Sequence, residues 1–422
     1  QMLACRLGKP EDGAKHALDN RACCEQYLSP GVRFMQRNNL VIAWMAGCFL
    51  FLTMLGIQAG QAVGAEGEQL RVYLGTYTQG KSQGIYVCEL ALATGKLTEP
   101  RLAAEINNPS FLAIAPGGKY LAAVSEISNL NGKPVGGVSS FAVNPHDGSL
   151  KLLSQQPSGG AGPCHVQFDR TGEFVLAANY GGGSCCVHPI DSEGKLAEMS
   201  AFQQHQGQGA ILPRQSAPHA HSIHVSPDNK YAFCVDLGLD KILIYKLLPH
   251  GKLEVNEPAF LSTEPGGGPR HFAFHPNGKF AYCNLEISSS VTALSYNPHH
   301  GMFTPLKTLS TLPQPTPGNS TAETQVHPSG KFVYVSNRGH NSIAIFKVME
   351  DGNLEAVGHQ GKGIKVPRNF GIDPTGRYAL VANQAGDDVL VFNIDQETGM
   401  LEPTEFRIEV PAPVCVKFLR KE

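Results

Sequence analysis

Residues 269–286 read Pro-Arg-His-Phe-Ala-Phe-His-Pro-Asn-Gly-Lys-Phe-Ala-Tyr-Cys-Asn-Leu-Glu, and this stretch decides the fold. Aromatic residues alternate with smaller ones on both sides of the turn residues 276–279. That pattern is typical of two antiparallel strands joined by a tight turn. A hairpin returns the chain to its starting edge, so we expect Arg270 and Glu286 to lie close together at the end away from the turn.

The same hairpin pattern recurs along the chain. Five further copies span residues 109–126, 163–180, 220–237, 321–338 and 367–384. A second marker is a glycine followed two residues later by Leu or Phe. It occurs seven times at intervals of 46 to 57 residues, at Gly95, Gly148, Gly194, Gly251, Gly301, Gly352 and Gly399. A period of about fifty residues with only strand and turn signals predicts a β-propeller with one four-stranded sheet, or blade, per repeat.

The sequence has seven glycine markers but six complete hairpins, and this difference predicts how the ring closes. The seventh inner strand is expected at residues 411–418, paired with a strand at 72–77 that is followed by another at 85–90. The predicted fold is therefore all-β, a seven-bladed β-propeller closed by its C-terminal inner strand pairing with the N-terminal strands. Such closure hides the strand edges that an open sheet would expose.

Residues 66–422 are expected to form the propeller, and the sequence before them differs in character. Residues 35–65 begin with Met35 and Arg37, continue into an apolar run over 40–57 and end in small residues. This is the pattern of a secretory signal peptide and predicts a periplasmic or secreted protein. The alternative is a membrane anchor through 40–57, so only this segment is expected to contact a membrane. Residues 1–34 are interpreted as unstructured or as a start-site artefact.

Composition argues against several classes of function. The formal net charge is −2, and the single tryptophan, Trp44, lies in the apolar run, so no nucleic-acid partner is predicted. Seven cysteines follow residue 65 without the paired spacing of zinc sites. They are interpreted as small buried side chains, with Cys164 and Cys415 close to the predicted site. We therefore predict no metal and no cofactor.

Aligning the repeats by their turns brings charged residues to one end of the propeller. Two adjacent positions at the start of each inner strand, and one at the end of the next strand, vary between blades. The first of the adjacent positions holds Ser110, Cys164, His221, Arg270, Ala322, Arg368 and Val414. The second holds Phe111, His165, Ser222, His271, Glu323, Asn369 and Cys415. The position at the end of the next strand holds Glu126, Tyr180, Leu237, Glu286, Arg338 and Gln384. A repeat without function would fill equivalent positions alike, so this variation predicts a small-molecule site at one mouth of the central channel. The side chains expected to bind substrate there are His165, His271, Glu323, Arg368 and Gln384.

Five motifs on this repeat resemble one family. They are Leu-Gly-Thr-Tyr-Thr at 74–78, His-Ala-His at 219–221, Gly-Pro-Arg-His at 268–271, Asn-Leu-Glu at 284–286 and Ser-Asn-Arg-Gly at 336–339. In this order they resemble the lactonase family of seven-bladed propellers, which includes the cycloisomerase type of 6-phosphogluconolactonase and fungal carboxy-muconate lactonising enzyme. The resemblance covers about residues 70–419.

The resemblance implies a catalytic set of one histidine, two arginines and one glutamate. The matching positions here are His221, Arg270, Arg338 and Glu286. It further implies metal-independent hydrolysis of an anionic sugar lactone of the 6-phosphogluconolactone type. Such a reaction needs a base for water, a cation facing the carbonyl oxygen and a proton for the leaving ring oxygen.

These residue types suit that chemistry. His221 can act as the general base, and Glu286 could orient it or share in proton transfer. The planar guanidinium groups of Arg270 and Arg338 suit a phosphate or carboxylate and the developing oxyanion.

Three alternatives remain open at this point. In a calcium-dependent lactonase, Glu126, Glu286 and Glu323 would supply oxygen ligands together with asparagines. A noncatalytic binding or scaffold propeller is favoured by Tyr-Val-Ser-Asn at 334–337, which is similar to the YVTN repeats of surface proteins. The same catalytic residues could also support a muconate-type lactonising cycloisomerase.

Overall fold

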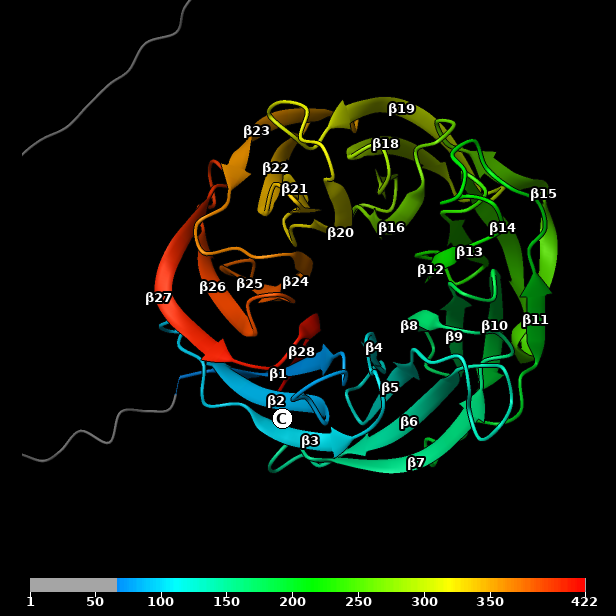
Figure 1. Cartoon of the computed structure of the whole chain (residues 1–422), viewed down its shortest axis with the longest axis horizontal. Helices are drawn as coiled ribbons and strands as arrows, with labels where there is room; N and C mark the ends of the chain where they lie inside the picture. Colours follow the sequence, from blue (N-terminus) through cyan, green and yellow to red (C-terminus); the bar gives the residue numbers. More distant parts are fainter. Residues whose placement is uncertain (1–66, 422) are drawn as a thin grey trace, which may run out of the picture. The chain divides into compact units, whose positions relative to one another are not determined.

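The structure is a computed structural model and describes residues 67–421. In this range the chain forms seven four-stranded antiparallel sheets, which stand as blades around a ring (Figure 1). The predicted all-β, seven-bladed propeller is confirmed. The predicted signal peptide at 35–65 and the segment 1–34 lie outside the described residues.

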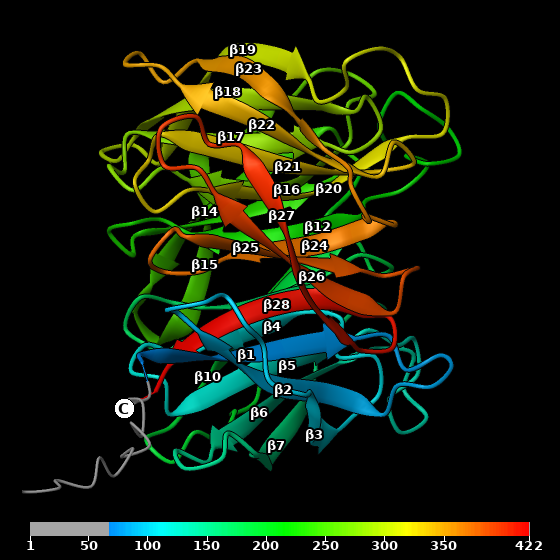
Figure 2. The same cartoon turned by 90° about the vertical axis from the view of Figure 1, so that its left-hand side faces the viewer.

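The first blade contains both ends of the described chain. It has the order β28 (Pro413–Arg420), β1 (Gln69–Thr76), β2 (Gly84–Ala91) and β3 (Arg101–Glu105). Strands β28 and β1 run side by side, with Val72 opposite Phe418 (Figure 2). The predicted ring closure is confirmed, although β28 begins and ends two residues later than expected.

The other six blades each follow chain order from the inner strand outward. Their inner hairpins are the six repeats predicted from the sequence. The strands are β4 (Leu112–Ile114), β5 (Tyr120–Ser125), β6 (Gly137–Val143) and β7 (Leu150–Pro157); β8 (Pro163–Phe168), β9 (Phe174–Asn179), β10 (Ser184–Pro189) and β11 (Ala201–Gln204); β12 (Ala220–Val225), β13 (Tyr231–Asp236), β14 (Lys241–Leu248) and β15 (Lys252–Ser262); β16 (Pro269–Phe274), β17 (Phe280–Leu285), β18 (Ser290–Asn297) and β19 (Met302–Ser310); β20 (Ser320–Val326), β21 (Phe332–Arg338), β22 (Ser342–Val348) and β23 (Leu354–Gln360); β24 (Pro367–Ile372), β25 (Tyr378–Asn383), β26 (Asp388–Ile394) and β27 (Leu401–Glu409).

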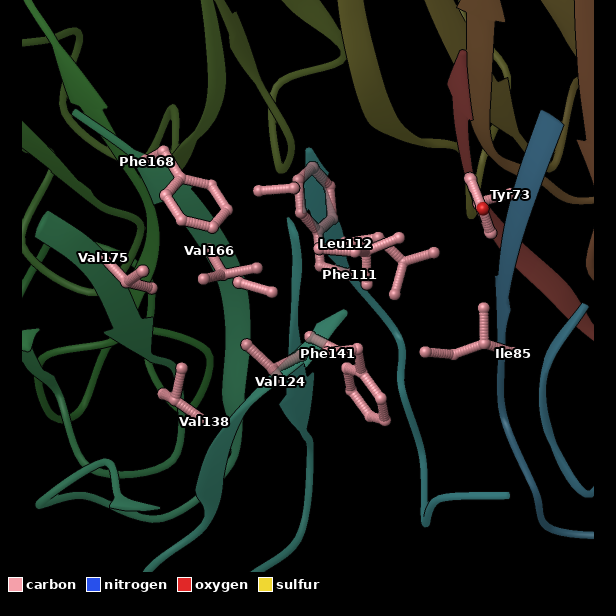
Figure 3. Packing of buried hydrophobic residues seen from close by; sticks show 14 of the residues in the cluster. Tyr73, Ile85, Phe111, Leu112, Val124, Val138, Phe141, Val166, Phe168 and Val175 are labelled. Atoms are coloured by element: carbon pink, nitrogen blue, oxygen red, sulfur yellow. The ribbon is translucent and has the colours of Figure 1, made fainter. Parts of the chain in front are cut away.

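The hydrophobic core lies between the blades. One cluster joins three consecutive blades through residues such as Ile85, Leu112, Phe141 and Val166, all of which are buried (Figure 3). Because each blade packs a neighbour on both faces, a middle strand such as β13 is buried along its whole length. Such strands are apolar on both faces, so strict alternation weakens there.

The marker glycines lie where one blade contacts the next. Gly352 has a φ of +83°, a left-handed conformation that favours glycine. A Cβ atom there would collide with the ring of Phe280 in the preceding blade. The Gly352 carbonyl oxygen also accepts a hydrogen bond of 3.2 Å from the hydroxyl of Tyr282. The glycine period that predicted seven blades therefore reflects a repeated contact between blades.

Helical structure within residues 67–421 is a single 3-10 turn, Pro249–Gly251. In the same range no helix has the length and apolar character needed to cross a membrane. The alternative membrane anchor at 40–57 lies outside the described residues.

Candidate active site

Extra residues in the inner strands turn side chains into the central channel. His221 in β12, Arg368 in β24 and Cys164 in β8 each lie where the register shifts and have no partner in the neighbouring strand. In β16 the shift lies between Pro269 and Phe272 and leaves Arg270 and His271 outside the regular ladder. Such β-bulges re-aim side chains and are frequent beside active sites.

A cavity of about 270 Å³ at the end of the channel away from the hairpin turns is called the mouth here. Its lining residues are Tyr77, Glu126, Cys164, Tyr180, His221, Arg270, Glu286, Arg338 and Arg368. The mouth therefore brings together all four side chains of the expected catalytic set. Arg270 and Glu286 form an ion pair of 2.7 Å across their hairpin, which confirms that the two ends of the repeat meet.

Glu286 is held by three arginines. Its Oε2 atom accepts a hydrogen bond of 2.7 Å from Arg270 and forms an ion pair of 2.9 Å with Arg338, while Oε1 accepts a hydrogen bond of 2.5 Å from Arg214. The side chains of Glu286 and Arg270 are 7% and 3% exposed, so this ion pair is shielded from water. Arg338 also donates to the carbonyl oxygen of Thr321, and this fixes its guanidinium plane.

These contacts determine the charges in the mouth. Burial alone would raise the pKa of Glu286, but the charges of Arg270 and Arg338 and the hydrogen bond from Arg214 outweigh it and hold that pKa well below its usual range. Burial, followed by the charge of Arg270, lowers the pKa of Arg338 to about 9, which leaves it protonated at neutral pH. Glu286 is thus a constant anion, which suits an orienting role better than proton transfer.

His221 is neutral and in contact with Arg270. Burial, and then the charges of Arg270, His271 and Arg368, lower its pKa well below the ordinary value. Nε2 of His221 is hydrogen-bonded to Arg270, and because a guanidinium can only donate, Nε2 is the acceptor. The ring proton is therefore on Nδ1, which faces Sγ of Cys164 at 3.6 Å.

Arg368 differs from the other arginines of the mouth. Among residues 67–421 its guanidinium makes no hydrogen bond or ion pair to a side chain or backbone oxygen, and it lies over the ring of Tyr77 at 5.3 Å. Tyr77 in turn donates a hydrogen bond of 3.0 Å to Glu126. Arg368 is therefore a partly buried cation that is free to bind an anion.

Three residues expected at the mouth are elsewhere. His165 and Glu323 line a second cavity of about 590 Å³ at the turn end of the channel, called here the opposite cavity. His271 is paired with Glu323 there, with 3.1 Å between Nδ1 and Oε2. The expectation that His165, His271 and Glu323 share the mouth was wrong, because each follows a bulged residue by one position and points toward the other end.

Only a very small space separates the two cavities. It measures about 10 Å³ and is lined by residues that include Arg270, His271 and Arg368. A space of that size holds about one water molecule at most. The mouth is therefore a blind pocket that a substrate enters and leaves from one side.

Gln384, which was also expected at the mouth, lies beside it. It lines a cavity of about 370 Å³ that shares Tyr77 and Glu126 with the mouth.

The structure does not bring together the three carboxylates of the calcium alternative. Glu323 is in the opposite cavity, and both oxygens of Glu286 are bound by arginines. Glu126 is bonded instead by the hydroxyl groups of Ser110 and Tyr77.

Sequence reasoning missed Arg214. It lies in the long connection between β11 and β12, outside every repeat position that was aligned. A signal was present, because Arg214 is the one arginine or lysine in residues 202–218, the long run that leads into an inner strand.

Comparison with known proteins agrees with this geometry. The family model for lactonases with a seven-bladed β-propeller matches residues 71–418, nearly the whole described chain. The chain belongs to this lactonase family.

The matches to known relatives extend over almost the full length of those proteins. This lactonase is 38% identical over 351 residues to a protein of Bacillus subtilis named 6-phosphogluconolactonase, and the match covers 83% of this chain and 98% of that protein. A second relative with the same name, from Formosa agariphila, is 35% identical over 340 residues, covering 78% and 94%. Among solved structures, the periplasmic gluconolactonase of Pseudomonas aeruginosa has a TM-score of 0.79 and 33% identity, covering 84% of this chain and all of that one.

Proposed function

We propose that this lactonase hydrolyses an anionic sugar lactone of the 6-phosphogluconolactone class at the mouth. The observation that carries the substrate class is the free guanidinium of Arg368 in a blind pocket. The lining holds three arginines against two glutamates, and Arg214 adds a fourth cation from the adjoining loop. An uncompensated cation in a shielded pocket favours a phosphate or carboxylate, which a guanidinium binds through two parallel hydrogen bonds.

Arg270 and Arg338 are proposed to stabilise the transition state. When water attacks the lactone carbonyl, its oxygen gains negative charge, and fixed donors in a shielded site stabilise that charge strongly. Arg270 and Arg338 are held in position by Glu286, and Arg338 has a buried Nε–H without a partner in residues 67–421. Arg338 is thus oriented before the substrate arrives, whereas Arg270 must first release His221.

His221 is proposed to be the general base. Its neutral imidazole has a lone pair on Nε2, which Arg270 covers in this structure. If Arg270 turns its N–H toward the substrate oxygen, Nε2 is freed to take a proton from the attacking water. The proton then returns from Nε2 to the ring oxygen as the C–O bond breaks, which yields the open-chain acid.

A lactone panel tests the proposal. The full chain is given phosphorylated and unphosphorylated gluconolactone, and acid release is measured above the spontaneous rate, with His221→Ala as the matched control. We expect faster turnover of the phosphorylated lactone at equal low concentration. A preference for the unphosphorylated lactone contradicts the anionic substrate class.

The two rival functions give different results in the same assay. Inertness toward every lactone, combined with binding to a ligand or surface, favours the noncatalytic propeller. Lactone formation from an unsaturated dicarboxylate favours the cycloisomerase.

We further propose that the protein is exported to the periplasm or secreted. The support is the signal-like sequence of residues 35–65, and the relative from Pseudomonas aeruginosa is named periplasmic. Fractionation of the native host, with sequencing of the mature N-terminus, tests this. A full-length protein recovered from the cytoplasm contradicts it.

A further inference from the structure

A polar cluster is buried in the apolar contact between the β8–β11 blade and the β12–β15 blade. It consists of Cys185 on β10, His205 just after β11 and Cys234 on β13, all fully enclosed. These strands lie on neighbouring blades (Figure 1). One potential ligand atom from each residue lies within 4.8 Å of the other two. The lactonase reaction uses none of these groups, so their burial among apolar side chains needs another explanation.

Asp236 fixes how His205 is presented. The Nδ1–H of His205 donates a hydrogen bond of 2.6 Å to Oδ2 of Asp236, and both side chains are almost completely buried. Nε2 of His205 is therefore the nitrogen with a free lone pair, and within residues 67–421 it has no hydrogen-bond partner. An unpartnered buried nitrogen is costly unless something binds it.

We propose that Cys185, His205 and Cys234 hold a structural zinc ion between these two blades. Two thiolates and an imidazole form a ligand set that zinc prefers, with water completing four-fold coordination. A carboxylate bonded to the second nitrogen of a metal-binding histidine is the usual supporting contact, and Asp236 supplies it here. Ligand bonds of about 2.0–2.3 Å place tetrahedral ligand atoms roughly 3.5–4 Å apart, so only a small contraction is required.

The sequence did not predict this site because its ligands come from three separate segments. Cys185, His205 and Cys234 lie on β10, after β11 and on β13, too far apart in the sequence to form a short metal-binding motif. The ion would also support the mouth indirectly. His205 begins the segment that carries Arg214, and Asp236 accepts a hydrogen bond of 2.8 Å from the backbone of His219 at its end.

Metal analysis of the full chain tests the proposal. The chain is purified under reducing conditions without chelator, and zinc is measured by elemental mass spectrometry. We expect about one zinc per chain in the natural protein and in Cys283→Ser, but almost none in Cys234→Ser. Cys283 is the matched control because it occupies the same position of β17 that Cys234 occupies on β13, and both are buried.

A second variant separates a metal site from a merely buried polar cluster. Asp236→Asn should weaken zinc affinity by about 10- to 100-fold, measured by competition with a chromogenic chelator. X-ray absorption on the natural protein should show two sulfur neighbours and nitrogen or oxygen, and this requires no variant to fold. The proposal is overturned if the natural protein retains no zinc, if Cys234→Ser retains as much as Cys283→Ser, if copper is the bound metal, or if Cys185 and Cys234 are joined by a disulfide.

Discussion

The mouth and the opposite cavity are built from neighbouring positions of the same inner strands, yet their side chains make different contacts. Arg270 bonds to Glu286 in the mouth, whereas the next residue, His271, bonds to Glu323 toward the other end. His221 and Arg368 likewise face the mouth, while His165 lines the opposite cavity. A single position along a bulged strand therefore decides which end of the channel a side chain serves.

The two ends also differ in charge. The mouth concentrates arginines, with Arg368 free to bind an anion. In the opposite cavity, two cations, Arg170 and Lys417, are balanced by two carboxylates, Asp169 and Glu323. Burial lowers the pKa values of His165, His224 and His271, so these rings are neutral. This contrast is why we assign the chemistry to the mouth.

The largest expected difference between the two ends is in turnover. His221→Ala should lower kcat by roughly 100- to 10,000-fold, the range for a lost general base. The matched control is His224→Ala, which removes a partly buried histidine of the same strand from the opposite cavity. Steady-state kinetics measures kcat of both variants, and circular dichroism checks that both are folded. Equal loss in the two variants would mean that the mouth has no special role.

The next effect concerns stability. Glu286→Gln leaves buried Arg270 without its counter-ion, which should cost about 3–5 kcal/mol of unfolding free energy in a denaturant titration. Because the folded-state pKa of Glu286 lies below its unfolded value of about 4.3, this contribution is present above that pH and is lost as pH falls toward the folded-state pKa. The difference in unfolding free energy between the natural protein and Glu286→Gln should thus be constant from about pH 5 to 8 and shrink below about pH 4. A difference that grows in acid would contradict this role of the Glu286 charge.

The fold and half of the site could be predicted from the sequence for a clear physical reason. Turn residues and marker glycines such as Gly352 are determined by local backbone geometry and blade contact, so they repeat visibly. The hairpin geometry was enough to bring Arg270 to Glu286. Bulges arise from pairing with the next strand and leave no such local pattern, which is why His165, His271 and Glu323 were assigned to the wrong end.

A smaller effect should separate substrate binding from catalysis within the mouth. Arg368→Gln removes the free cation, and a hydrogen bond to a charged group contributes about 1.5–3 kcal/mol, so KM for the phosphorylated lactone should rise roughly 10- to 100-fold. KM for the unphosphorylated lactone should change less, and kcat should be largely kept. Arg368→Lys should fall between, because the ammonium keeps the charge but loses the planar fork. If both lactones respond equally, Arg368 does not bind the phosphate.

The smallest expected effect is the response to pH near neutrality. A general base must be deprotonated to act, and the pKa of His221 is lowered by burial and by Arg270, His271 and Arg368. Its neutral form therefore persists as the pH falls through about 6.5, the ordinary histidine value. We expect kcat/KM to stay flat between about pH 6 and 8 and to decline only in more acidic solution. A Gln at position 368 removes one of the charges that depress this pKa, so the acidic limb of Arg368→Gln should move to higher pH. If kcat/KM of the natural protein already declines near pH 6.5, a more exposed group takes the proton from water. The role of His221 would then be to hold Arg270 toward the substrate.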